Sequence, residues 1–139
     1  MSQVSAGTMV EVMVRMQQQH NDEVHLAWRD QGFEYYRAIW VECAELLDHF
    51  GWKWWKKQAT DVDQVKLEIV DIWHFGLSDL MRAQRLDESV SNRLAALSSG
   101  GRHDAEAFRQ AVEALAQTTL TKQAFDLQPF LDVMVALPM

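Results

Sequence analysis

The stretches Trp40-Val-Glu-Cys-Ala-Glu45 and Glu68-Ile-Val-Asp-Ile-Trp-His-Phe75 decide the fold, and each carries two acidic residues three positions apart. On a helix, residues at this spacing face the same side, so each stretch presents a pair of carboxylates. Four carboxylates on two facing helices form a site for a hard cation. The intervening run Gly51-Trp-Lys-Trp-Trp-Lys-Lys57 adds lysines, which suit a polyphosphate. These residues together predict a metal-dependent nucleotide hydrolase.

The second acidic pair lies on the most apolar helix that the sequence predicts, over residues 65–82. Almost no polar face remains on this helix, so we expect it to be buried and Glu68 and Asp71 to be partly buried with it. An unpaired buried carboxylate costs several kcal/mol or takes up a proton. Lys66, the only lysine or arginine in residues 62–81, points away from the pair. We therefore expect a divalent cation, shared with the first acidic pair, to neutralise these carboxylates.

Hydrophobic periodicity predicts a single all-α domain over residues 1–139, with about five helices in a bundle-like packing. No strand alternation and no internal repeat is present in the sequence. The first expected helix covers residues 9–20 behind a Thr8-Met-Val-Glu11 capping box, and a connection at 23–32 leads to a second helix at 33–50, which Gly51 ends. The third helix, at 65–82, is capped by Asp61 or Asp63. A short helix at 89–97, a loop at 98–101, a helix that starts at Asp104 and an apolar helix within 125–137 complete the chain.

Composition and charge exclude several classes of protein. Hydrophobic residues make up 48% of the chain, which is typical of a globular protein rather than a disordered one. The formal net charge of -7 argues against a general nucleic-acid binder. The sequence shows neither a signal peptide nor an apolar run long enough to span a bilayer, so we expect a cytoplasmic protein without nucleic-acid or membrane partners. Cys43, the single cysteine, is interpreted as a small core residue rather than a nucleophile.

The polar run Gln17-Gln-Gln-His-Asn-Asp22 at the end of the first expected helix has two interpretations. It is either a solvated, frayed helix end or a segment that recognises a nucleobase through side-chain amides. Gln17 and Asn21 are four positions apart and share one face of a helix, and amides pair well with the edge of a base. The residues alone leave both interpretations open.

The two acidic pairs and the segment between them resemble a known pattern, that of the all-α NTP pyrophosphatases of the MazG-like superfamily. The longer strings Val41-Glu-Cys-Ala-Glu-Leu-Leu-Asp48, Trp52-Lys-Trp-Trp-Lys56 and Glu68-Ile-Val-Asp-Ile-Trp-His-Phe75 resemble the dimeric dUTPase branch of that superfamily. Met16-Gln-Gln-Gln-His-Asn21 is similar to the N-terminal glutamine-and-asparagine segment of the same branch. The resemblance covers about residues 9–80, and it is specific because separate long strings agree in order and spacing.

The resemblance implies hydrolysis of dUTP to dUMP and pyrophosphate by a homodimer, and it leaves dUDP open as a second substrate. It implies a metal cofactor, Mg²⁺ with Mn²⁺ as a substitute, bound by Glu42, Glu45, Glu68 and Asp71. Of the catalytic candidates Glu42 and Glu45, we expect Glu42 to orient the attacking water. The implied nucleotide contacts are Gln17 and Asn21 with uracil, Lys53 and Lys56 with the phosphates, Trp54 with the base, and His74 near the nucleoside.

The dimeric dUTPase branch usually carries a later motif, a Gly-Lys-Asn stretch followed by Phe-Arg-Gln and Gly-Tyr, that helps to close the site over the phosphates. We expect no counterpart of this motif in the chain. The chain is therefore interpreted either as truncated before the closing segment or as a member that closes its site by another device.

Three alternatives stay open. The first is a di-iron carboxylate bundle, to which Asp71-Ile-Trp-His74 points, but such sites need this type of motif on two helices and it occurs on one. The second is a helical dimer that binds nucleotides without hydrolysing them or has a purely structural role. The third is a related pyrophosphatase with another base preference, which Gln17 and Asn21 would determine.

Overall fold

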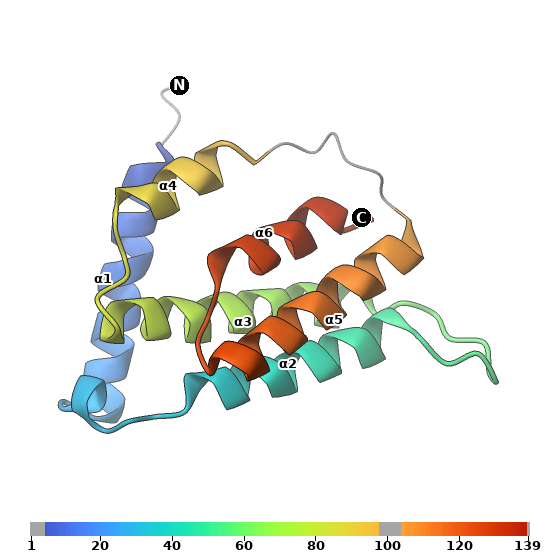
Figure 1. The fold of residues 1–139 in the computed structure, drawn as a ribbon, viewed down its shortest axis with the longest axis horizontal. Helices are drawn as coiled ribbons and strands as arrows, with labels where there is room; N and C mark the ends of the chain where they lie inside the picture. The colour runs from blue at the N-terminus through green and yellow to red at the C-terminus, as the bar shows by residue number, and fades with distance from the viewer. Residues whose placement is uncertain (1–4, 98–103, 139) are drawn as a thin grey trace.

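The computed structural model describes residues 5–97 and 104–138, and within these ranges the chain is all-helical (Figure 1). The predicted all-α class is confirmed, whereas the expected loop at 98–101 lies outside the described residues. Among the described helices, none is long and apolar enough to cross a membrane. In chain order the elements are α1 (Ala6–Val24), the short 3₁₀ helix η1 (Trp28–Asp30), α2 (Tyr35–Phe50), α3 (Val62–Arg82), α4 (Glu88–Ala95), α5 (Ala105–Lys122) and α6 (Leu127–Ala136).

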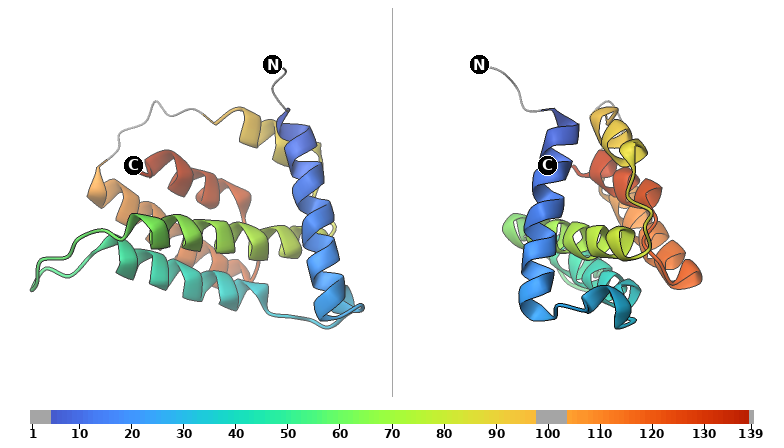
Figure 2. Two further views of the ribbon diagram at one scale, coloured as in Figure 1. Left: turned by 180° about the vertical axis from the view of Figure 1, so that it is seen from behind. Right: turned by 90° about the vertical axis from the view of Figure 1, so that its left-hand side faces the viewer.

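The pair of helices α2 and α3 forms the centre of the molecule. The two helices lie side by side in opposite directions and are joined by the connection 51–61, which projects beyond them (Figure 1). α5 packs against α2 and α6 packs against α5, while α1 crosses the C-terminal end of α3 with α4 beside it (Figure 2). The two acidic stretches therefore lie on the two central helices, one on each.

Side-chain caps determine where the helices begin. Of the two predicted caps of α3, Asp61 is the one that forms, because its Oδ1 accepts the backbone N–H of Gln64 at 3.2 Å and the helix begins at Val62 rather than near residue 65. The predicted cap at Thr8 is wrong, because Ser5 Oγ accepts the Thr8 N–H at 3.1 Å and α1 begins at Ala6. Either residue type can satisfy a free N–H group of the first turn, and the earlier one does so here. α1 also continues to Val24, past its expected end.

The connection between α1 and α2 is packed rather than open. Trp28, which we expected in a loop, is only 1% exposed. Its Nε1 donates to Asp22 Oδ1 at 3.1 Å, and the guanidinium carbon of Arg29 lies 4.3 Å from the centre of its ring. These contacts fix the C-terminal end of α1, which carries the predicted amide pair.

α3 is not buried on all sides, which corrects the expectation from its apolar composition. Glu68 is buried, with an exposed fraction of 4%, whereas Leu67 and Val70 are 51% and 46% exposed. The reason is that α3 packs along α2 and meets α1 near its C-terminal end, so that its first half keeps one apolar face open. Asp71 is half-buried, as expected.

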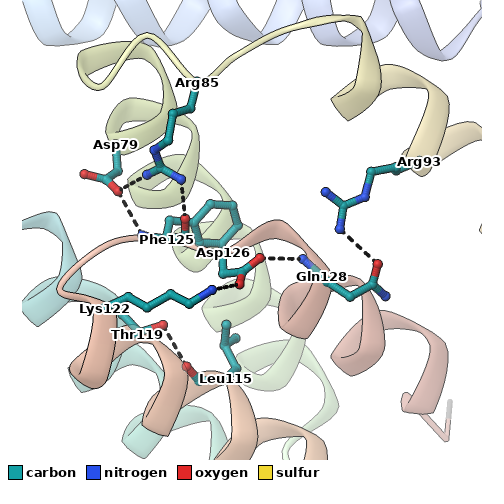
Figure 3. Close-up of polar contacts among 9 residues, drawn as sticks. All are labelled: Asp79, Arg85, Arg93, Leu115, Thr119, Lys122, Phe125, Asp126 and Gln128. Atoms are coloured by element: carbon teal, nitrogen blue, oxygen red, sulfur yellow. Dashed lines mark hydrogen bonds and ion pairs between the residues drawn. The ribbon is translucent and has the colours of Figure 1, made fainter.

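The carboxylate of Asp79 ties the end of α3 to the turn between α5 and α6 (Figure 3). Asp79 is buried, and its Oδ2 accepts hydrogen bonds from Phe125 N and Arg85 Nη2, both at 2.8 Å. Its Oδ1 accepts from Arg82 Nη2 at 2.6 Å, and Arg85 Nη1 donates to the Phe125 carbonyl at 2.8 Å. One buried side chain thus holds the α5–α6 hairpin on the central pair.

Gly76 lets the Phe125 ring reach the surface of α3, because a Cβ at Gly76 would lie 2.7 Å from that ring. We expect Gly76→Ala to destabilise the fold by about 1–3 kcal/mol, the usual cost of overpacking. Gly7→Ala is the matched control in α1, where the new Cβ would meet only Ser5 Oγ at 3.9 Å. That change should be neutral or stabilising by up to about 1 kcal/mol. Urea unfolding measures both, and equal effects would contradict the close contact.

Candidate metal and nucleotide site

Three carboxylates from the two acidic pairs meet between α2 and α3. Glu42 and Glu45 on α2 and Glu68 on α3 each bring one oxygen into a group whose members lie within 4.8 Å of one another. Asp71, the fourth predicted ligand, is one helical turn beyond Glu68 on α3 and is not part of this group. The structure therefore brings three of the four predicted metal ligands together and leaves the fourth beside them.

The oxygen atoms of this group suit a divalent cation. Glu42 Oε2 is buried and has no hydrogen-bond partner within the part of the chain that the structure describes. A buried carboxylate oxygen without a partner is unfavourable, so the site favours a positively charged occupant. Carboxylate oxygens are the donors that Mg²⁺ and Mn²⁺ prefer. The residues present therefore fit the metal that the sequence predicts.

Electrostatic repulsion within the group acts most strongly on Glu42. Burial raises the pKa of Glu42 to about 7. The negative charges of Glu45, Asp71 and Glu68 act in the same direction, as does a hydrogen bond with Glu45. Without a cation, the group therefore holds a proton up to about neutral pH, because its carboxylates cannot all ionise at low cost.

His49 is a partner of the site that the sequence analysis missed. Its Nδ1 lies 3.0 Å from Glu68 Oε2, and this hydrogen bond is the main cause that raises the pKa of His49. For Glu68 itself, burial raises the pKa and the contact with His49 opposes the rise. The expectation that only a cation could neutralise Glu68 is therefore incomplete. The sequence could have indicated this contact, because His49 follows Glu45 by four positions and so lies on the same face of α2 as the acidic pair.

The predicted amide pair connects α1 to α3. Gln17 Nε2 donates to Asn21 Oδ1 at 2.9 Å, and Asn21 Nδ2 donates to Ser78 Oγ at 3.0 Å. Asn21 is only 8% exposed and α1 continues to Val24, so the segment is not a frayed helix end, although Gln18, Gln19 and His20 are exposed to solvent. Base recognition by the pair stays a prediction. His74, the predicted nucleoside neighbour, is exposed on α3.

The connection 51–61 has a fixed base and an exposed tip. Gln58 Oε1 accepts the backbone N–H groups of Trp52 at 3.0 Å and Lys53 at 2.8 Å, which closes the base of the loop. Lys53 Nζ lies 3.9 Å from Asp48 Oδ1 at the end of α2. At the tip, Trp54 is 84% exposed and Lys56 is also exposed. Both predicted phosphate ligands and the predicted base contact thus lie in one segment that follows the acidic helix α2.

The family of the chain follows from its sequence as a whole, because a family model described as dUTPase matches residues 9–138. The chain belongs to the all-α dUTPase family. The match extends the resemblance of residues 9–80 over nearly the full length, and it supports a nucleotide hydrolase of the dUTPase type. No curated protein matches the chain. Membership of this family also speaks against the di-iron alternative.

One element of the family's closing motif is present, contrary to our expectation. Phe108-Arg109-Gln110 lies within α5, although the sequence contains neither Gly-Lys-Asn nor Gly-Tyr. The Phe108 ring packs against Phe50 with 4.5 Å between centroids, and Arg109 Nε donates to the Gly51 carbonyl at 2.8 Å. In this structure the tripeptide holds α5 against the end of α2.

Cys43 lies on α2 next to the acidic pair, but it takes no part in the site. The residue is buried, with an exposed fraction of 2%. Burial raises the pKa of its thiol to about 12, so the thiolate is not available at neutral pH. The interpretation of Cys43 as a core residue is confirmed.

The raised pKa of Glu42 predicts how the metal-free fold responds to pH. Glu42 has an ordinary value of 4.5 and a folded-state value of about 7, so the folded state keeps a proton that the unfolded state loses between these values. Stability should therefore fall as pH rises through this window. The raised pKa of His49 gives the same sign, because its favourable contact is lost as the imidazole deprotonates.

Urea unfolding in EDTA at about pH 5 and about pH 8 measures this dependence. Glu42→Gln should reduce it, whereas Glu113→Gln on the exposed side of α5 should leave it unchanged. A metal-free chain that is equally stable at both pH values would contradict the electrostatic account of the site.

Proposed function

We propose that the chain hydrolyses dUTP to dUMP and pyrophosphate, with Mg²⁺ held by Glu42, Glu45, Glu68 and Asp71. The observation that carries the proposal is the group of three carboxylates within 4.8 Å, one of which has a buried oxygen with no hydrogen-bond partner among the described residues. Family membership supports the same class of reaction. Mn²⁺ is the expected substitute, because it accepts the same oxygen ligands.

The arrangement along α3 supports a nucleotide as the ligand. Asp71, His74 and Ser78 follow one another on one side of α3 at spacings of three and four positions. Ser78 contacts Asn21, so the amide pair lies at one end of this line and the carboxylates lie at the other. The rise from Asp71 to Ser78 is about 10 Å along the helix axis. A single nucleotide can extend over such a span with its base at the amides and its phosphates at the carboxylates.

Each side chain of the site has a separate role in the proposed hydrolysis. Glu42, Glu45, Glu68 and Asp71 would hold Mg²⁺, which would supply positive charge to offset the negative charge that grows on the phosphates in the transition state. Lys53 and Lys56 act as point charges on the phosphates. Trp54 lies in the connection 51–61, at the opposite end of α3 from Asn21, so its predicted contact with a base placed at the amide pair does not fit this arrangement within one chain. Glu42 orients the attacking water through a hydrogen bond that the water donates to the carboxylate.

The products test the reaction type. With dUTP and Mg²⁺, ³¹P NMR should show dUMP and pyrophosphate appearing in equal amounts. The appearance of dUDP and phosphate would contradict the proposal. Binding of dUTP that requires Mg²⁺ but leads to no turnover would instead identify a nucleotide-binding homologue without activity.

We also propose that the chain forms a homodimer through the exposed apolar face of the central helices. α2 exposes Trp40 and Val41, and the adjacent α3 exposes Leu67 and Val70. Large apolar side chains of this kind are unfavourable in water and are typical of an interface. The proposed interface lies beside the carboxylates, because Trp40 and Val41 line a hollow together with Glu45.

Analytical ultracentrifugation tests the dimer. The unmodified chain should sediment with a mass near twice the 16.1 kDa of one chain, and Val70→Lys should sediment as a monomer. Leu120→Lys is the matched control, because Leu120 on α5 is similarly exposed at 42% and lies outside the proposed interface. A monomeric unmodified chain, or equal effects of both lysines, would contradict the proposal.

A further inference from the structure

Ser78 is a buried hydroxyl with two defined partners. Its side chain is 1% exposed in the second half of α3. The Oγ–H donates to the His74 carbonyl at 3.0 Å, and Oγ accepts from Asn21 Nδ2 at 3.0 Å. A serine hydroxyl has only one proton, and here that proton is committed to the carbonyl. Ser78 can therefore only accept from the amide that faces it.

This restriction fixes the orientation of the Asn21 amide. Because Ser78 must receive a proton, Asn21 has to turn its NH₂ group toward α3 and its oxygen toward Gln17. Gln17 Nε2 in turn donates to that oxygen at 2.9 Å. An amide oxygen accepts two hydrogen bonds and an NH₂ group donates two, so Asn21 keeps one acceptor position and one donor position in a fixed order.

We propose that Ser78 is a positioning residue that makes the site select uracil over cytosine by locking the Asn21 amide. The proposal rests on the proposed function and extends it to the choice of base. Uracil presents the N3–H donor next to the O4 acceptor, whereas cytosine presents the N3 acceptor next to the N4 donor. If the base is held in one orientation, an Asn21 amide of fixed orientation can form both hydrogen bonds with only one of these two bases. An amide that can rotate by half a turn matches either.

The loss of the hydroxyl should therefore weaken discrimination more than catalysis. In Ser78→Ala, nothing on α3 dictates which end of the Asn21 amide faces it. We expect kcat/KM for dUTP relative to dCTP to fall at least about tenfold, since a bidentate contact to the wrong base normally costs that much or more. KM for dUTP should rise while its kcat stays close to that of the unmodified chain, because the carboxylates are unchanged.

Thr119 provides a matched control for the removal of a buried hydroxyl. It is 0% exposed in α5, and its Oγ1 donates to the Leu115 carbonyl at 2.7 Å, the same type of backbone contact that Ser78 makes (Figure 3). Thr119→Val should affect stability but leave the preference for dUTP unchanged. Ser78→Cys is a second variant that keeps the approximate size of the side chain with a weaker donor and acceptor, and we expect it also to lower the preference.

The experiment measures kcat/KM for dUTP and dCTP, and the affinities for dUMP and dCMP by calorimetry, in the unmodified chain and in all three variants. Circular dichroism confirms folding, and Ser78→Cys replaces Ser78→Ala if the latter does not fold. An unchanged dUTP preference in the Ser78 variants, or an equal loss in Thr119→Val, would overturn the role of Ser78 and leave the proposed function intact. If the unmodified chain neither hydrolyses dUTP in preference to dCTP nor binds dUMP in preference to dCMP, both the role of Ser78 and the proposed function are overturned.

Discussion

Glu68→Gln is expected to reduce Mg²⁺-dependent hydrolysis of dUTP by at least about 100-fold, more than loss of an outer contact to a metal ligand usually costs. Glutamine keeps the size of the side chain and one oxygen, but it removes the negative charge. Glu68 is the α3 member of the carboxylate group, so its charge is needed to hold a cation between the two helices. The charge interaction of Glu68 with His49 would be lost as well, although the amide oxygen could still accept a hydrogen bond.

The measurement is steady-state pyrophosphate release together with Mg²⁺ affinity by calorimetry. Glu113→Gln is the matched control, because it makes the same chemical change at an exposed position on α5. Loss of activity and metal affinity in Glu68→Gln but not in Glu113→Gln supports the site. Full activity in Glu68→Gln would show that the carboxylate group does not hold the functional metal.

Asp79→Ala should produce the largest loss of stability, about 3 kcal/mol, because the change breaks several contacts of one buried carboxylate. Arg82 and Arg85 each lose a carboxylate acceptor, although Arg85 keeps its bond to the Phe125 carbonyl, and the buried N–H of Phe125 loses the acceptor that it has in the structure. The arginines are partly exposed and can turn to water, so the buried backbone N–H should dominate the cost. We also expect the α5–α6 hairpin to separate from α3 at lower denaturant concentrations than the central pair.

Urea unfolding followed by circular dichroism measures the free energy, and hydrogen exchange of the α5 and α6 amides measures the local opening. Asp132→Ala is the control, because Asp132 is an exposed aspartate on α6, and the change should stay within about 0.5 kcal/mol. Similar effects of the two substitutions would show that the buried carboxylate is not what attaches the hairpin.

Much of the fold could be predicted because it depends on local periodicity. The spacing of Glu42 and Glu45 on α2 determines that both face one side of the helix. The stop at Gly51 follows from the residue type alone, whereas the residue types left the cap of α3 open between Asp61 and Asp63. The start of α1 was misplaced because Ser5 and Thr8 both suit a cap, and only the complete first turn decides between them.

Other features could not be predicted, because they join residues that are far apart in the sequence. The contacts of His49 with Glu68 and of Asn21 with Ser78 depend on how α2, α3 and α1 pack together. Composition also misled, since the apolar residues of α3 predicted burial on all sides, whereas Leu67 and Val70 are about half exposed. An apolar sequence predicts that a helix surface is buried, but it does not show whether the same chain or another chain buries it.

The most direct test of the central claim is pyrophosphate release from dUTP, dCTP, dTTP and UTP, each measured with Mg²⁺ and with EDTA. The claim is that the carboxylates between α2 and α3 hold a metal that serves the hydrolysis of dUTP. The account predicts release from dUTP in preference to the other three nucleotides, abolished by EDTA and restored by added Mg²⁺ or Mn²⁺. Release that persists in EDTA, or no release and no Mg²⁺-dependent binding of any of the four nucleotides, would contradict it.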